Sequence, residues 1–352
     1  MEFIRYENNP IITPEDVKPY HENHEVIGAF NAGIAEYNGE TLMLLRVAER
    51  PISEDENIGK PTIYNAEEGK TEFLEFNKND KDYNFDDSRL IKHVSNLNGF
   101  KYLTSLSYLR IARSKDGFNF KVDEKPFIYP SNASETFGVE DARISKIDDT
   151  YYITYTAVSP DGVGEAMVST KDFKNKNYHG MIFAPENKDV ILFPEKINGK
   201  YYALHRPSLK SVGDFNIWIA ESENLNHWGN HKLLLKVNQD NWDSGRIGAG
   251  LTPIKTEKGW LEIYHGATKD HRYCMGAVLL DLNDPTKVIA RTEKPIIEPK
   301  EEYERNGFFG GVVFGCGHVM KDNIITMYYG VSDTSMACGT MRLEDVLEAF
   351  DK

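Results

Sequence analysis

Two adjacent carboxylates and a guanidinium stand at the start of a strongly patterned β segment. Glu140, Asp141 and Arg143 lead into residues 144–155, in which β-branched and aromatic runs flank an Asp-Asp-Thr turn. Side chains of a regular strand alternate between its two faces, so we expect Asp141 and Arg143 on one face and Glu140 on the other. Such a set is either a structural ion pair or part of a functional site. Perturbed pKa values would not separate the two, because both arrangements perturb them.

The elements that must position these residues are repeated hairpins. Six strand–turn–strand segments recur at a step of about fifty to sixty residues, which is typical of propeller blades. They cover residues 33–46, 89–103, 141–155, 192–206, 251–265 and 318–329. Further strands that run into polar turns follow at 111–118, 167–173 and 217–225. Each hairpin with its following strand and turn would form one four-stranded antiparallel sheet. The regular step favours a β-propeller over an array of β-sandwiches, and only residues 343–350 resemble a helix.

Polar residues gather where the innermost strands of such a propeller would meet at its axis. The strand starts carry Asn31, Arg89, Asp141, Arg143 and Glu195, and the returning strands carry Arg46, His205, Arg206 and His265. Buried charge is costly unless it is paired or used. The sequence therefore predicts a polar axial site.

Composition excludes several classes of function. The net charge of −14 argues against a general binder of nucleic acids or of anionic membranes, and the hydrophobic fraction of 40% is sufficient for a buried core. The three cysteines have no CxxC spacing, which indicates neither a zinc site nor a disulfide framework. The first residues lack a signal-peptide core, and no apolar run approaches membrane-spanning length. We expect a cytoplasmic protein.

Several motifs together resemble the signature set of glycoside hydrolase family 130. They are residues 138–143, 192–197, 205–207, 264–266 and 276–282, and the resemblance extends from Asn31 to Asp333. That family comprises β-mannoside phosphorylases, with some hydrolases, on a five-bladed propeller. The resemblance implies a single catalytic domain over residues 1–352, an all-β five-bladed β-propeller with a short C-terminal helix. Because the chain has six hairpins and not five, we expect one terminal hairpin to help close another blade.

Inverting cleavage of a β-mannoside needs an acid for the leaving oxygen and a nucleophile on the opposite face of the ring. In a phosphorylase the nucleophile is phosphate, which cations must hold. By resemblance the proton donor is Asp141, acting directly or through a sugar hydroxyl. The resemblance implies phosphate binding by Lys188, Arg206, Arg246 and His265, with Tyr273 lining the phosphate or acceptor side. It implies substrate binding by Asn31, Arg46, Asp333, Glu140, Arg89 and Arg143, of which Arg89 and Arg143 are expected to orient neighbouring carboxylates.

Three positions depart from the family pattern. Lys188 stands where Arg is expected and Arg246 where Lys is expected, so the charge is kept while the donor geometry changes. Asp189 stands where Asn would be usual, and a carboxylate beside a phosphate site weakens the case. The cations nevertheless favour phosphorolysis over hydrolysis, for which Glu195 would be the candidate base.

Substrate linkage is the least determined feature. Residues 139–143 with 151–158, and residues 308–318, most resemble members that act on β-1,2-mannobiose and β-1,2-oligomannan, while β-1,4 linkage stays open. The expected partners are a β-linked mannooligosaccharide and inorganic phosphate as co-substrate, with no nucleic acid, membrane, metal or organic cofactor. A homo-oligomer and a non-catalytic carbohydrate-binding propeller also stay open.

Overall fold

The computed structural model describes residues 2–96, 99–208 and 212–351, and within them β-strands dominate. The helices are short: α1 (Glu302–Arg305), α2 (Leu343–Glu348) and the 3-10 turns η1 (Pro14–Asp16), η2 (Ala133–Glu135) and η3 (Ala349–Asp351). This arrangement confirms the prediction of an all-β chain with a short C-terminal helix. Among the described helices, none has the length and apolar character that crossing a membrane requires.

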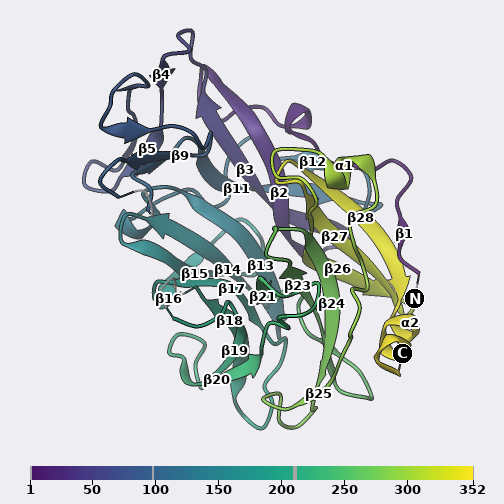
Figure 1. The fold of residues 1–352 in the computed structure, drawn as a ribbon. Helices are drawn as coiled ribbons and strands as arrows, with labels where there is room; N and C mark the ends of the chain where they lie inside the picture. The colour runs from purple at the N-terminus through teal and green to yellow at the C-terminus, as the bar shows by residue number, and fades with distance from the viewer. Residues whose placement is uncertain (1, 97–98, 209–211, 352) are drawn as a thin grey trace.

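Five antiparallel sheets carry most of the described strands (Figure 1). The first contains β2 (His24–Tyr37), β3 (Glu40–Pro51), β11 (Leu106–Ser114) and β12 (Lys121–Val122). The second contains β13 (Val139–Ile147), β14 (Thr150–Ser159), β15 (Gly162–Thr170) and β16 (Asn177–Phe183). The third contains β17 (Asn187–Leu192), β18 (Tyr201–Pro207), β19 (Ile217–Ser222) and β20 (Gly229–Leu235). The fourth contains β21 (Arg246–Gly248), β22 (Ile254–Lys255), β23 (Trp260–Ala267), β24 (Tyr273–Leu280) and β25 (Val288–Arg291). The fifth contains β26 (Val313–Lys321), β27 (Ile324–Val331), β28 (Ser335–Arg342) and β1 (Ile4–Arg5).

The remaining strands belong to an insertion between β3 and β11, at the upper left of Figure 1. Its small sheets pair β4 (Ile58–Gly59) with β7 (Phe76–Asn77), β5 (Thr62–Asn65) with β6 (Lys70–Phe73), and β9 (Leu90–His93) with β8 (Tyr83–Asn84) and β10 (Tyr102–Leu103). The predicted hairpin at 89–103 is thus β9–β10, part of the insertion, and residues 97–98 in its turn lie outside the described residues. The expectation that a terminal hairpin accounts for the sixth unit is wrong, because the surplus hairpin is this internal one.

Turn chemistry explains why the hairpins were readable from the sequence. Asn38 and Gly39 both adopt positive φ, at 51° and 79°, and Asn198 and Gly199 do so at 50° and 82°. Two consecutive residues with positive φ form the type I′ turn, whose twist matches that of antiparallel strands. Asn tolerates this conformation and Gly adopts it without steric cost. The sequence therefore fixes these strand connections locally.

The sheets contact one another in chain order, and the last returns to the first. Strand β2 contacts both β13 and β26, β13 contacts β17, β18 contacts β21, and β24 contacts β26. Buried side chains join neighbouring sheets: Ile34 of β2, Leu44 of β3 and Ile153 of β14 belong to one apolar cluster. Strands β2, β13, β17 and β26, through which the chain first enters four of the sheets, thereby lie near one another in the interior.

Both ends of the described chain meet in the fifth sheet (Figure 1). Strand β1 pairs with β28, and Arg5 reaches from β1 to the buried Glu304 of α1. The two side chains make a bidentate ion pair, with Nε to Oε1 at 2.7 Å and Nη2 to Oε2 at 2.9 Å. The hydroxyl of Tyr329 also donates to Glu304. The carboxylate therefore ties β1, α1 and β27 together.

Arg5→Ala is expected to lower the free energy of unfolding by about 3 kcal/mol, because it leaves the carboxylate of Glu304 buried without its cation. Chemical denaturation with urea measures this change. Arg342→Ala is the matched control: its pair with Glu344 has side-chain exposures of 63% and 60%, and the loss should stay below about 1 kcal/mol. Equal losses in the two variants would contradict the assigned role of the Arg5–Glu304 pair.

Candidate active site

Three interior strands are interrupted at the positions that carry candidate polar side chains. Asn31 in β2, Asp141 in β13 and Asp189 in β17 adopt positive φ, at 47°, 48° and 58°. Each lies where the strand register shifts against its neighbour, as in a β-bulge. Bulges re-aim side chains and are common beside active sites, and left-handed non-glycine residues cost about 1–3 kcal/mol each. The same strained conformation at equivalent positions of three strands indicates a functional site.

The bulge at Asp141 overturns the expected alternation of Glu140, Asp141 and Arg143. Arg46 donates from Nη1 to Asp141 Oδ1 and from Nη2 to Glu140 Oε1, both at 2.9 Å. The two adjacent carboxylates thus share one guanidinium, whereas Arg143 is buried beneath the ring of Phe314, 5.1 Å from its centroid. Arg143 does not form the predicted pair with Asp141 across one strand face. The extra residue of the bulge is the physical reason.

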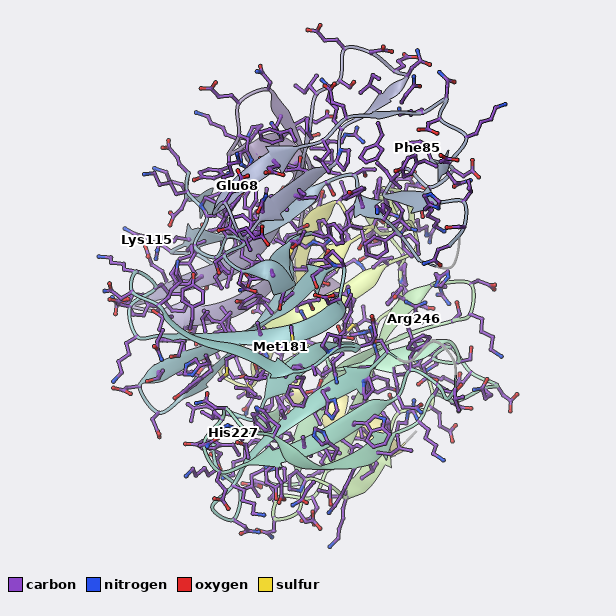
Figure 2. All side chains as sticks on the ribbon, turned by 90° about the vertical axis from the view of Figure 1, so that its left-hand side faces the viewer. Glu68, Phe85, Lys115, Met181, His227 and Arg246 are labelled. Carbon is purple, nitrogen blue, oxygen red and sulfur yellow. The ribbon has the colours of Figure 1, made fainter. Side chains whose placement is uncertain are left out.

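A pocket of about 560 Å³ opens over these bulges, within the size range of small-molecule sites. Its lining includes the predicted residues Asn31, Arg46, Arg89, Asp141, Lys188, Arg206, Arg246, Tyr273 and Asp333. These residues come from all five large sheets and the insertion. The proton-donor candidate and the predicted cations therefore face one space. Figure 2 displays Arg246 on the same side of the view as Phe85 of the insertion, with Lys115 on the other side.

One end of the pocket concentrates cations around the carboxylate of Asp189. Lys188 and Arg206 are cross-strand neighbours on β17 and β18. Arg206 Nη1 lies 2.7 Å from Asp189 Oδ2, and His265 Nε2 lies 3.3 Å from the same oxygen. Arg246 completes this end and stacks on Phe215 at 5.5 Å. Planar guanidinium donors beside a point charge suit recognition of an oxyanion.

Two glycines make room for the polar side chains of the bulges. A Cβ on Gly248 would lie 2.2 Å from Asp189 Oδ2 and 2.6 Å from the His265 ring. A Cβ on Gly330 would lie 2.0 Å from Asn31 Oδ1. No real Cβ tolerates such distances, so neither position accepts a larger residue without displacing its neighbour. The backbone of β21 and β27 is thus shaped around Asp189 and Asn31.

The carboxyl groups in the pocket have different proton affinities. Burial opposes ionisation of Asp141, but Arg46, Lys188 and Arg143 prevail and lower its pKa. Burial raises the pKa of Asp333 to about 6, and the like charges of Asp141 and Glu140 add to this rise. The pocket therefore pairs an ionised carboxylate with one that titrates near neutrality.

Three predicted site residues lie behind the pocket surface. Glu140 bridges Arg46 and Lys188, the latter at 3.5 Å, His265 is fully buried against Arg206 and Asp189, and Arg143 lies under Phe314. They can position lining residues but do not reach the open space. Glu195, the candidate base of a hydrolase, pairs instead with Lys255 and is half exposed. It is not among the residues that line the pocket.

The sequence did not identify several lining residues. They are Glu186, Ser208, Phe215, His271, Phe309, Val312, Phe314 and Val163. Phe309 and Phe314 belong to residues 308–318, which we used only to predict the substrate linkage. Their aromatic rings are suited to contact sugar faces or cations. His271 Nδ1 lies 3.3 Å from Arg246, a contact between the start of β21 and the β23–β24 loop that local pattern does not reveal.

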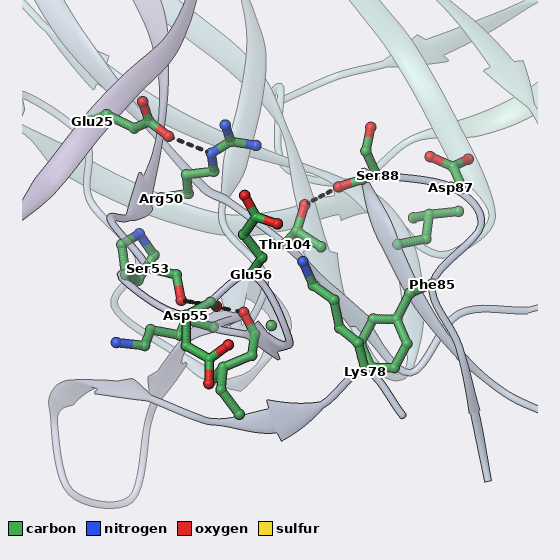
Figure 3. Close-up of a pocket in the computed structure, with 15 residues that line it drawn as sticks. Glu25, Arg50, Ser53, Asp55, Glu56, Lys78, Phe85, Asp87, Ser88 and Thr104 are labelled. Carbon is green, nitrogen blue, oxygen red and sulfur yellow. Dashed lines mark hydrogen bonds and ion pairs between the residues drawn. The ribbon is translucent and has the colours of Figure 1, made fainter. Parts of the chain in front are cut away.

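A second cavity, of about 570 Å³, lies between the insertion and the ends of β2 and β3 (Figure 3). Its Arg50 is paired with Glu25 at 2.7 Å. Its Asp87 pairs with Arg89, which lines the first pocket, so the loop at 87–89 separates the two spaces. None of the predicted site residues lines the second cavity. They line the first pocket or lie behind it, so the first pocket is the candidate site.

No metal site emerges from the portions of the chain that the structure describes, where no three His, Cys, Asp or Glu side chains are grouped to hold an ion. What the pocket does offer is a carboxylic acid, Asp141, and several cations that line one space of about 560 Å³. That arrangement can transfer a proton on one side while an anion is held on the other.

Comparisons with known proteins relate the chain to mannoside phosphorylases. The model of glycoside hydrolase family 130, described as β-1,4-mannooligosaccharide phosphorylase, matches residues 100–352. A β-1,2-mannobiose phosphorylase of Listeria innocua is 59% identical over 351 residues, covering 100% of this chain and 99% of that protein. A 1,2-β-oligomannan phosphorylase of Thermoanaerobacter sp. is 43% identical, covering 70% of this chain and 81% of that protein. The solved structure of the Listeria enzyme with β-1,2-mannobiose covers 100% of this chain and 99% of its own, with a TM-score of 0.97.

The raised pKa of Asp333 predicts a pH-dependent cost to stability. A carboxyl whose pKa rises from 3.8 to about 6 on folding binds more protons when folded, so stability falls as pH rises between these values. Asp333→Asn removes this loss. The difference in the free energy of unfolding between the variant and the original chain should therefore shift by about 2 kcal/mol in favour of the variant from pH 4.5 to pH 7.5. Urea unfolding of both proteins at the two pH values measures the gain. A difference that does not change with pH would refute the assignment.

Proposed function

We propose that this chain, which belongs to glycoside hydrolase family 130, is an inverting phosphorylase that converts β-1,2-mannobiose and phosphate to mannose 1-phosphate and mannose. The observation that carries the proposal is the single pocket that Asp141 shares with Lys188, Arg206 and Arg246. An acid and an anion site on opposite sides of one sugar ring are the requirements of inverting phosphorolysis. The nucleophile is then phosphate, and no protein base is needed.

The roles of the side chains follow from their places. The mannose ring lies over Asn31, Arg46 and Asp333, whose amide, guanidinium and carboxyl groups suit hydroxyl partners. Phosphate binds among Lys188, Arg206 and Arg246, with the buried His265 supporting Arg206. A phosphate oxygen attacks the anomeric carbon while the glycosidic oxygen leaves with a proton from Asp141, directly or through a sugar hydroxyl. Tyr273 lines the phosphate or acceptor side.

Asp141 must gain a proton before it can donate one. Its pKa is lowered because Arg46, Lys188 and Arg143 outweigh the effect of burial. A bound phosphate dianion offsets part of this positive charge, which raises the proton affinity of a nearby carboxylate. The acid is thus prepared when the nucleophile is in place. Glu140 assists by holding Arg46 and Lys188.

The relatives support β-1,2 linkage. The family model carries a β-1,4 description and matches residues 100–352, whereas the Listeria β-1,2-mannobiose phosphorylase matches the whole chain at 59% identity. Full-length similarity includes the insertion at the pocket edge, which supplies Arg89. The disaccharide is favoured over longer β-1,2-oligomannans because the oligomannan phosphorylase matches less of the chain at 43% identity.

The architecture that serves this function is a single domain, residues 1–352, built as a five-bladed β-propeller. Support comes from the five large sheets and their sequential contacts, which lead from the fifth sheet back to the first. The pocket then lies at the axial end of the inner strands. We also expect a cytoplasmic enzyme that uses phosphate as co-substrate and no metal or organic cofactor. These remain predictions from the sequence.

Product analysis with β-1,2- and β-1,4-mannobiose, with and without phosphate, tests the proposal. Mannose 1-phosphate should form from the β-1,2 sugar only when phosphate is present. Asp141→Asn should reduce the rate by at least about 1,000-fold, since the amide has no acidic proton to donate. Free mannose in equal yield without phosphate would identify a hydrolase, and binding without turnover would identify a carbohydrate-binding protein.

Arg206→Ala is expected to raise the KM for phosphate by at least about tenfold, because a charge-assisted contact to the anion is lost. The KM for mannobiose should change much less. Steady-state kinetics with each substrate varied in turn separates the two effects. Arg272→Ala, which removes an exposed arginine paired with Glu298, is the control and should leave both constants unchanged. An unaltered KM for phosphate in Arg206→Ala would remove Arg206 from the phosphate site.

A further inference from the structure

A carboxylate stands inside the cation cluster where an anion is expected to bind. Asp189 is 7% exposed and lines the pocket. Its Oδ2 faces Arg206 at 2.7 Å and His265 at 3.3 Å. Its Oδ1 accepts no hydrogen bond from the residues that the structure describes. Oδ2 is therefore held by ion pairs and not by a well-aligned hydrogen bond, and Oδ1 is available as an acceptor.

This arrangement is built into the backbone. Asp189 occupies a left-handed bulge with φ of 58°, and Gly248 leaves space that any side chain would take from the carboxylate. Despite its burial, the pKa of Asp189 lies well below the usual range because of Arg206 and His265. The group stays ionised and can only accept hydrogen bonds. A fully deprotonated anion would meet repulsion here, whereas an anion with its own hydroxyl would meet a partner.

We propose that Asp189 selects a protonated oxyanion, such as phosphate, over an unprotonated one of the same shape, such as sulfate. The inference rests on the proposed function and identifies the group that discriminates between co-substrates. Near neutral pH both ionic forms of phosphate keep at least one P–OH, and sulfate keeps none. Asp189 Oδ1 accepts the hydrogen bond from that P–OH, while Arg206 and its neighbouring cations bind the unprotonated oxygens. A site that rejects by repulsion as well as by lost contacts discriminates strongly.

The reaction balances with this arrangement. In HPO₄²⁻ the hydroxyl donates to Asp189, and one unprotonated oxygen attacks the anomeric carbon as the C–O bond to the leaving sugar breaks. The leaving oxygen takes the proton of Asp141, so the products are the singly charged mannose 1-phosphate, mannose and the Asp141 carboxylate. Two negative charges are present before and after the step. Asp189 neither gains nor loses a proton and acts as a specificity-determining residue.

Competition between anions tests the inference. Phosphorolysis is measured at low phosphate with increasing sulfate, and calorimetry measures the binding of phosphate, arsenate and sulfate to the free protein. In the original chain, sulfate should bind at least about 100-fold more weakly than phosphate, since it lacks the donor that the site requires. Arsenate keeps a proton near neutral pH and should bind like phosphate. Sulfate binding as tight as phosphate binding would overturn the inference without any variant.

Asp189→Asn replaces the acceptor by a side chain that can also donate. The ratio of sulfate to phosphate dissociation constants should fall by at least about tenfold, because repulsion of sulfate is removed. Arg246→Ala is the control, since Arg246 lines the same site without pairing with Asp189, and its loss should weaken both anions and leave the ratio nearly unchanged. An unchanged ratio in Asp189→Asn, or loss of both anions from a folded variant, would overturn the inference. Absence of phosphate-dependent turnover in the original chain would instead refute the proposed function.

Discussion

The contact between Arg46 and two adjacent carboxylates determines the arrangement of the pocket. A regular strand would place Glu140 and Asp141 on opposite faces, yet both accept hydrogen bonds from one guanidinium at 2.9 Å. The left-handed backbone of Asp141 makes this possible. Asn31 donates to the same Asp141 oxygen at 3.1 Å. The position of the candidate acid is thus fixed by partners from two other strands, β2 and β3.

The charged side chains of the pocket form ion pairs with one another. Arg46 faces Glu140 and Asp141, Lys188 faces Glu140, and Arg206 faces Asp189. Burial of isolated charges would cost several kcal/mol each, and pairing reduces this cost. A ligand with hydroxyl groups and negative charge can take over part of these contacts. The protein therefore keeps several charged side chains close together at this site by pairing them with one another.

Local sequence patterns were sufficient for the hairpins and for some of the residues around the pocket, such as Asn31, Arg46 and Arg206. Asn-Gly turns and alternating strands identify hairpins because both signals act over a few residues. The same signals could not separate the 89–103 hairpin from the others, since only its tertiary partners differ. They could not show that a bulge turns Asp141 away from Arg143, because a single extra residue shifts the register of the whole strand. The motif resemblance, and not periodicity, led to Lys188, Arg246 and Asp333.

The neighbours of Asp189 show which contacts could not be predicted from the sequence. Its place beside Lys188 was evident from the sequence, and its carboxylate counted against a phosphate site. Its contacts with Arg206 and His265 join three strands of two sheets, and no local pattern encodes such contacts. The space left by Gly248 is equally a property of the assembled fold. Chemistry that depends on long-range packing must be obtained from the structure.

The pairing of β1 with β28 has a consequence for biosynthesis. Asn9 donates to the carbonyl of Cys338, and Ile4 lies opposite Thr340. Asn9 and Cys338 are 329 residues apart in the sequence, so the fifth sheet cannot be completed until the ribosome has made β28. Until then β1 and the edge of β27 that β28 later covers are open to wrong pairing. Nascent chains that stall late in synthesis should therefore depend on chaperones more than the finished protein does.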